Sequence, residues 1–165
     1  MKKLFPLLLC LLLLTACGKA STDQGAESSS ASVVNPWTDQ PSLDAATRAV
    51  GIELSVPETI NGYDPPIYRT MAGLIEVLYR SDTGEIRIRK ASSLQTEGSD
   101  ISGDYNVYLE HTAIPTVGED ATITLDGNDG TVSRALWSVN GFDYSITVDP
   151  ATNVQTLSAL TAQVS

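Results

Sequence analysis

The stretch Arg134-Ala-Leu-Trp-Ser-Val-Asn-Gly-Phe-Asp-Tyr-Ser-Ile-Thr147 decides the predicted fold. Apolar and polar residues alternate on both sides of Asn140-Gly141, a dipeptide that favours a type I′ turn and so sets the register of a β-hairpin. Because side chains alternate along a strand, polar residues such as Ser138 and Asp143 fall on the opposite face from the apolar ones. The stretch therefore predicts an antiparallel sheet with one buried face, carrying three apolar pairs: Val139 with Phe142, Trp137 with Tyr144, and Ala135 with Ile146.

A second hairpin is predicted upstream, from residues 67 to 80 and 85 to 91 with a loop at 81 to 84. In this register apolar residues pair on one face, and opposite charges meet on the other. The expected pairs are Tyr79 with Ile86, Val77 with Ile88, Arg80 with Glu85, and Glu76 with Arg89.

The remaining elements follow from capping residues and turn dipeptides. Ser42 as N-cap and Gly51 as the stop predict a helix of about nine residues. Further strands are expected at 52–56, 105–116 and 121–125, with a turn at 126–130, and Asp149-Pro150 is expected to end the last strand. A closing helix is predicted from an apolar stripe formed by Val154, Leu157, Leu160 and Val164.

The predicted fold class is α+β. We expect an antiparallel meander sheet of about six strands, with a short N-terminal helix and a C-terminal helix packed on it.

The N-terminus carries a targeting signal. Lys2 and Lys3 precede an apolar run from Leu4 to Leu14, which is well short of the roughly 20 residues of a membrane-spanning helix. The run leads into Leu-Thr-Ala-Cys17, which resembles the bacterial lipobox. We therefore predict a lipoprotein signal peptide at 1–16 and a lipidated Cys17 that holds the mature protein on the extracytoplasmic side of the cell membrane. The alternative is an ordinary secreted protein with a cysteine near its cleavage site.

Residues 17–35 are expected to be the lipidated cysteine and a flexible tether, because this stretch is rich in Ser, Gly and Ala and has no aromatic residue. About 18 such residues span on average about 25 Å. A single globular α+β domain is expected at 36–165.

Composition excludes several classes of function for the mature domain. Cys10 lies in the predicted signal peptide and Cys17 is predicted to carry lipid, so disulfides, thiol nucleophiles and cysteine metal sites are excluded. Loss of Lys2 and Lys3 leaves 8 basic against 20 acidic side chains, a net charge of −12. Nucleic acid and anionic surfaces would repel such a protein as a whole. No cofactor is expected.

Several segments together resemble a family of small lipoproteins of Gram-positive bacteria. They are Asn35-Pro-Trp37, Ile88-Arg-Lys-Ala91, Asp100-Ile-Ser-Gly-Asp-Tyr105, Gly127-Asn-Asp-Gly-Thr131, Trp137 and Tyr144-Ser-Ile146. That family is similar to extracytoplasmic domains of unknown function, including the outer parts of anti-sigma-factor-like membrane proteins. The resemblance would cover residues 35–165, and it implies an extracytoplasmic domain without supplying catalytic residues.

Two groups of residues are candidates for ligand binding. Arg87, Arg89 and Lys90, with Arg69 and Arg80 nearby, are expected on the polar face of the sheet and would form an anion-binding patch. The alternative is cross-strand charge balance, which leaves Arg87 as the freest member. Asp100 and Asp104 lie in one loop and would bind a cation weakly, unless the loop merely solvates them.

Other constellations are weaker. His111 has no second histidine or nucleophile motif beside it, so an edge position is expected. The stretch Asp126-Gly-Asn-Asp-Gly130 resembles the start of a calcium loop, but Gly130 and Trp137 stand where ligands would be needed, so a hairpin turn is expected and no metal site is predicted. Trp137 and Tyr144 are expected in the core, whereas the place of Trp37 stays open.

We therefore expect a non-catalytic, lipid-anchored extracytoplasmic module that binds a small ligand or a protein and serves envelope sensing. The alternatives are a surface hydrolase that uses paired carboxylates, and a structural accessory of an envelope complex.

Overall fold

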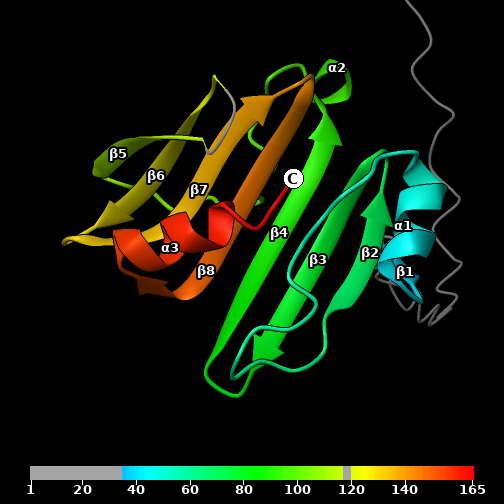
Figure 1. Ribbon diagram of the computed structural model, residues 1–165, viewed down its shortest axis with the longest axis horizontal. Coiled ribbons are helices and arrows are strands. Elements are labelled where there is room, and N and C mark those ends of the chain that lie inside the picture. The colour runs from blue at the N-terminus through cyan, green and yellow to red at the C-terminus, as the bar shows by residue number, and fades with distance from the viewer. Residues whose placement is uncertain (1–34, 117–119) are drawn as a thin grey trace, which may run out of the picture. The chain divides into compact units, whose positions relative to one another are not determined.

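A computed structural model describes residues 35–116 and 120–165, so the predicted signal peptide, Cys17 and residues 18–34 of the tether lie outside the described residues. Figure 1 shows the central feature, an eight-stranded sheet in the order β1-β2-β3-β4-β8-β7-β6-β5. Every neighbouring pair in it is antiparallel. Its strands are β1 (Thr38–Gln40), β2 (Ile67–Met71), β3 (Leu74–Ser81), β4 (Gly84–Ser92), β5 (Glu110–Pro115), β6 (Thr122–Asn128), β7 (Thr131–Val139) and β8 (Phe142–Thr152).

Three helices accompany the sheet: α1 (Leu43–Val50), the four-residue α2 (Ser93–Thr96) and α3 (Val154–Thr161). The α1 helix has the predicted ends, because the Ser42 side chain accepts a hydrogen bond from the Ala45 backbone N–H and Gly51 stops the helix in the left-handed conformation. None of the helices in the described part of the chain is long and apolar enough to cross a bilayer.

The two predicted hairpins are confirmed. Val139, Trp137 and Ala135 of β7 stand opposite the predicted partners in β8, around a turn in which Asn140 and Gly141 both have positive φ. In β3 and β4 the two apolar and the two charged pairs form as predicted. The α+β class is therefore correct, and periodicity located its best-defined strands.

The predicted single meander of about six strands is wrong. The sheet has eight strands because Thr38–Gln40 adds an edge strand and because the expected strand at 67–80 is two strands, β2 and β3, joined by a tight turn at Ala72-Gly73. It consists of two four-stranded meanders, β1 to β4 and β5 to β8, which join where β4 pairs with β8. The chain must consequently travel from β4 to the far edge of the sheet before it can form β5.

Three further strand predictions differ from the structure: one strand is absent, one starts later and one ends later. Residues 52–56 form no strand: Ile52 and Leu54 are buried in the core, and Ser55 exchanges backbone hydrogen bonds with Ser165. The strand expected from residue 105 begins only at Glu110. Finally, β8 does not end at Pro150 but continues to Thr152, because Pro150 lies where the register shifts and has no partner residue, so its missing N–H breaks no ladder bond.

One face of the sheet carries the hydrophobic core. It includes Val77, Ile88 and Ile146, all fully buried, together with Leu157 of α3. Trp137 and Tyr144 lie on this face as predicted, with their rings stacked at a centroid distance of 4.9 Å. We call it the α3 face.

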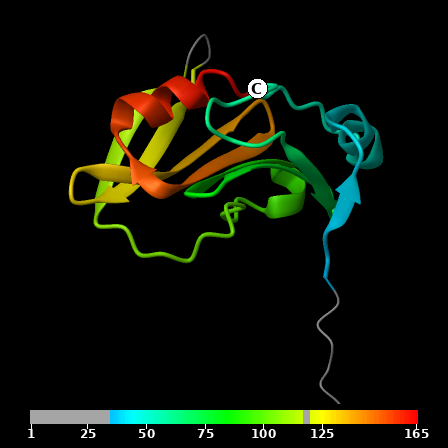
Figure 2. The ribbon, with the colours of Figure 1, turned by 90° about the horizontal axis from the view of Figure 1, so that it is seen from below.

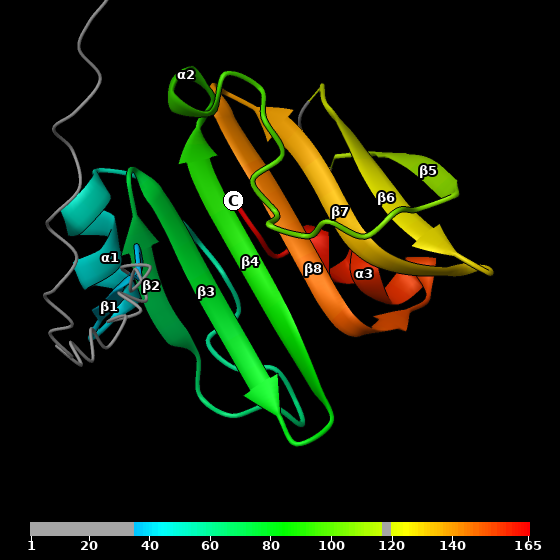
Figure 3. The ribbon, with the colours of Figure 1, turned by 180° about the vertical axis from the view of Figure 1, so that it is seen from behind.

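Residues 97–109, here named the crossing segment, run over the opposite face from α2 to the start of β5. Figure 3 shows this segment lying across β8, β7 and β6 on the side away from α3, and Figure 2 shows it below the sheet while α3 lies above. The candidate site is built between this segment and the sheet.

Candidate functional site

A buried charge network occupies the sheet beneath and beside the crossing segment. Glu76 of β3 is completely buried, and three arginines from two neighbouring strands surround its carboxylate. Arg69 of β2 donates to Oε1 through both Nε and Nη2, and Arg89 of β4 donates from Nε to Oε2 at 2.7 Å. The third, Arg87, places its Nε 3.4 Å from Oε2. Such an arrangement is stable only because the buried charge is paired.

Trp37 completes this network at the edge of the sheet. Its ring lies 5.1 Å from the Arg69 guanidinium and 5.0 Å from that of Arg89, which are cation–π distances. The place of Trp37, left open by the sequence, is therefore against the arginines on the polar face, and the chain enters the domain on that side.

Arg89 and Arg134 fasten the crossing segment to the sheet. Arg89 donates from Nη1 to the carbonyl oxygen of Ile101 at 2.8 Å. Arg134 of β7 donates to the Asp100 carboxylate at 2.8 Å and to the carbonyl oxygen of Asp104 at 3.2 Å. The segment thus lies on the face because two arginines bind it at its centre.

The close approach at this point requires a glycine. Gly103 has φ +64°, and a Cβ built there would lie 2.4 Å from Nη1 of Arg89. The contact with Arg89 therefore depends both on the positive φ of Gly103 and on its lack of a side chain.

Lys90 does not belong to the predicted cation patch. The residue lies between Arg89 and Ala91 in β4 and faces Tyr144 across the pair with β8, so it points to the α3 face. Its ammonium group lies 4.8 Å from the ring of Phe142 and 4.7 Å from that of Tyr144. The prediction grouped three consecutive cations, but alternation along a strand separates the middle one from its neighbours.

Arg87 and Asp104 meet in a hollow of about 410 Å³, which we name the Arg87 hollow. Its other lining residues come from the crossing segment and from β4, β7 and β8: Glu85, Asn106, Tyr108, Ser133, Thr147, Val148 and Asp149. Among the described residues Arg87 donates one hydrogen bond, from Nη2 to Glu85, while its buried Nε faces the Glu76 carboxylate and is closed to a ligand. A guanidinium has five N–H donors, so Arg87 keeps donors for another molecule.

The wall of the Arg87 hollow is held by Tyr108. Its hydroxyl donates to the Asp104 carboxylate, and its ring lies 5.0 Å from the Arg134 guanidinium. Burial raises the pKa of Tyr108, and the hydrogen bond to Asp104 raises it further, so the phenol stays protonated and remains a donor.

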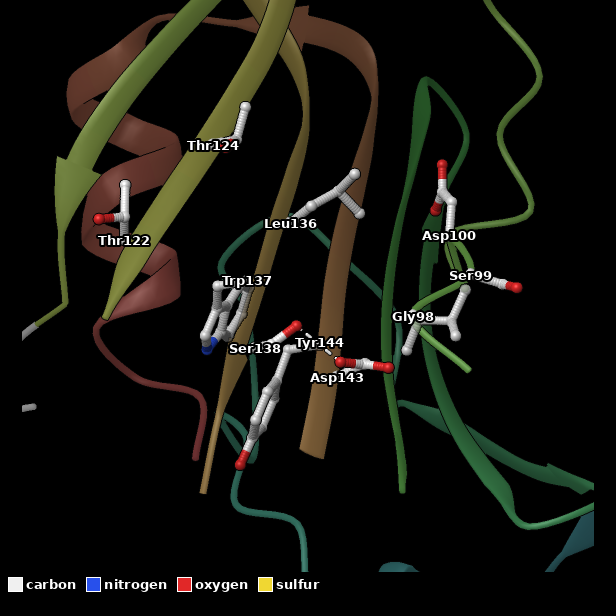
Figure 4. A pocket seen from close by; sticks show the side chains of 11 residues that line it. Gly98, Ser99, Asp100, Thr122, Thr124, Leu136, Trp137, Ser138, Asp143 and Tyr144 are labelled. Carbon is white, nitrogen blue, oxygen red and sulfur yellow. Dashed lines mark hydrogen bonds between the residues drawn. The ribbon is translucent and has the colours of Figure 1, made fainter. Parts of the chain in front are cut away.

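A second hollow of about 440 Å³ lies between the start of the crossing segment, at residues 98–101, and strands β6, β7 and β8, and Figure 4 shows the side chains that line it. Asp143 of β8 is buried here and accepts hydrogen bonds from three hydroxyls, those of Ser93, Thr96 and Ser138. Burial raises the pKa of the Asp143 carboxyl, but the three hydroxyls lower it by more, so the net pKa is below its usual value. Asp143 is thus ionised and ties α2 to the sheet. The predicted candidate Asp100 lines the same hollow.

The weaker candidates have structural roles. His111 lies on the edge strand β5 with its Nδ1 2.7 Å from the Asp126 carboxylate. Asp126 also accepts from Arg134 at 2.8 Å, while Asp129 and Gly130 form a turn with positive φ. Within residues 35–116 and 120–165 no three acidic, histidine or cysteine side chains are grouped as metal ligands would be.

Sequence reasoning missed Arg134, Tyr108 and Asp143. Alternation along 134–147 puts Arg134 on the same face as Ser138, but its partners are 30 and 34 residues away in the chain, and no local pattern indicates such contacts. Tyr108 did carry a signal, because Asp104, Asn106 and Tyr108 alternate with apolar residues, as in an extended segment whose one side faces a polar surface.

Comparison with known proteins adds no relative: no family model matches the chain, and neither a curated protein nor a solved structure matches it significantly. The resemblance to small Gram-positive lipoproteins therefore stays a prediction.

Proposed function

We propose that this chain is a non-catalytic module, anchored through a lipid on Cys17 at the extracytoplasmic side of the cell membrane, which binds a small neutral polyhydroxylated ligand in the Arg87 hollow. One observation carries the proposal. The hollow is lined by a guanidinium with unused donors, by carboxylates and by an amide, and its volume suits a small molecule. A module so placed would serve envelope sensing.

The lining favours hydroxyl groups over charged ones. Donors are supplied by Arg87, Asn106 and hydroxyl side chains, and acceptors by Glu85, Asp104 and Asp149. Because a hydroxyl both donates and accepts, a sugar-like ligand satisfies both kinds of partner. Three carboxylates against one guanidinium make the hollow net negative, so anionic ligands would be repelled.

The test is a thermal-shift titration of the lipidated full chain in detergent with neutral mono- and disaccharides. Saturation at about 100 times Kd stabilises a protein by about 2.7 kcal/mol, which is a shift of several degrees. Asn106→Ala removes an exposed lining amide together with its side-chain hydrogen bond to Tyr108, so it should weaken binding while the unliganded Tm falls only slightly.

The matched control is Asn61→Ala, an exposed asparagine beside α3 on the other face. Equal responses of both variants to the sugar, or no response of the wild-type chain to any neutral sugar, would refute the ligand assignment. Anchoring is tested separately by Cys17→Ser, which should abolish incorporation of labelled palmitate.

The hydrolase alternative is favoured by one observation, namely that Glu85, Asp104 and Asp149 line a single hollow. Glu85 already accepts from Arg80 and Arg87, and Asp104 from Tyr108. Hydrolysis of a glycoside that is lost in Asp104→Asn would establish an enzyme in place of the binding module.

A further inference from the structure

Exposed apolar side chains gather on one short part of the described chain. Among the large hydrophobic residues, Tyr105 is 96% exposed, Val107 81% and Leu109 83%, and Leu94 in the preceding helix is 91% exposed. Three of these follow one another at every second position of the crossing segment. Neighbouring exposed apolar residues of this kind mark contact surfaces more often than isolated ones do.

The row is held outward by the polar residues that alternate with it. Asp104, Asn106 and Tyr108 face the Arg87 hollow, and in extended chain the intervening side chains must then point the other way. Asn128 of β6 fixes the backbone from beneath, since its side chain accepts from the Leu109 N–H at 2.8 Å and donates to the Val107 carbonyl at 3.3 Å. The apolar side chains are therefore presented to a partner by a segment that is bound along its other side.

The place where the chain enters the domain, at Asn35, indicates what covers the apolar row of Tyr105, Val107 and Leu109. The described part begins at Asn35, next to Trp37, which stacks on the arginines of the same face. Figure 2 shows this entry and the crossing segment on one side of the sheet, opposite α3. With Cys17 acylated as proposed, the predicted flexible tether of about 18 residues would keep a bilayer within about 25 Å of this side.

The chemistry of the row suits a lipid surface. Residues 105–109 carry no charged side chain, and tyrosine with its apolar ring and polar hydroxyl prefers the membrane–water interface. The flanking Asp104 and Glu110 are acidic, which favours a surface of neutral headgroups over an anionic one.

We propose that Tyr105, Val107 and Leu109 dock into the interfacial layer of the bilayer that carries the anchor. This inference rests on the proposed lipidation of Cys17. Because the same segment walls the Arg87 hollow on its inner side, docking holds the hollow at the membrane surface instead of letting the domain tumble on its tether.

The test uses the mature lipidated chain in phosphatidylcholine vesicles, with a fluorophore on a new cysteine as Val107→Cys. Gln155→Cys is the matched control, because Gln155 is exposed on α3 at the opposite side of the sheet. Lipids brominated in their acyl chains should quench the label at 107 several-fold more strongly than the label at 155. Adding Tyr105→Ser and Leu109→Ser to the chain labelled at 107 should reduce quenching to the level of the control.

The outcomes separate the two proposals. Vesicle-bound protein with equal quenching at both positions overturns the docking while the anchor stands. Protein that does not partition with the vesicles overturns both. A photocrosslinker on the same Val107→Cys cysteine that captures a protein in native membranes, when the fluorophore at 107 shows no quenching by lipid, overturns the docking in favour of a protein partner.

Discussion

On the α3 face of the sheet, the fully buried side chains of Val77 and Ile88 pack in an apolar cluster with Leu157. On the opposite face, at the neighbouring position of β3, the fully buried side chain is Glu76, with three arginines around it. Strand β3 therefore contributes to an apolar core on one face and to a buried charge network on the other. Apolar burial has no direction and tolerates exchange between similar residues, whereas a buried carboxylate depends on each partner that compensates it.

The two faces also differ in the segments that cover them. The α3 face is covered by a helix that presents an apolar stripe, and the segment around Ile52 and Leu54 adds to it. The polar face is covered by a segment that two arginines hold through carbonyl and carboxylate oxygens. Few contacts hold the crossing segment on the polar face, so single substitutions should loosen it selectively.

The largest expected effect comes from the charged interior. Glu76→Gln removes the buried charge that three arginines share, and breaking a buried pair costs about 3–5 kcal/mol. Chemical denaturation followed by circular dichroism measures the change. Glu85→Gln is the control, because Glu85 is partly exposed on the same face, and it should cost about 1 kcal/mol or less. Equal losses in both variants would contradict the distinction between the buried and the exposed pairs.

The apolar interior should respond to cavity formation. Leu157→Ala empties space under α3 at a fully buried position and should cost about 2–5 kcal/mol in the same unfolding experiment. Leu160→Ala, at a partly buried position on the same helix, should cost less. A smaller loss at 157 than at 160 would show that α3 is not held by this stripe.

The fastening of the crossing segment is tested by two glycines. Gly98 and Gly103 both have positive φ, but a Cβ at 98 meets nothing within 4 Å while one at 103 overlaps Arg89. Gly98→Ala should therefore cost only the conformational term of about 1–2 kcal/mol. Gly103→Ala should cost more and should raise hydrogen exchange within 97–109 while β7 and β8 stay protected. Identical effects would argue against the close contact.

The smallest expected effect is the pH dependence from Asp143. A carboxyl whose pKa is lower in the folded than in the unfolded state binds fewer protons when folded. Its stabilisation is therefore complete above the unfolded value of 3.8 and is lost as pH falls through the lowered folded pKa. Asp143→Asn should flatten the acid end of the stability curve, measured by thermal unfolding between neutral and acid pH. An unchanged acid slope would contradict the role of the three hydroxyls.

Part of the site was predictable because cross-strand pairs are local. The register of β3 and β4 placed Glu76 opposite Arg89, and the structure adds that Arg87 keeps unused donors beside the hollow. The error at Lys90 was avoidable, since strand periodicity alone assigns it to the other face. That Arg87 and Asp104 line one hollow was not predictable, because it depends on the path of the crossing segment.

By itself the sequence determined the α+β class, both hairpin registers, the caps of α1 and the apolar stripe of α3. All of these depend on turn chemistry and on periodicities of two or 3.6 residues, which act over short distances in the chain. Only the tertiary structure decided that β4 pairs with β8, that residues 97–109 must therefore cross the polar face, and that Arg134 meets Asp100 there. These contacts join residues far apart in sequence, and their partners are chosen by the closing of the whole sheet, which no local pattern encodes.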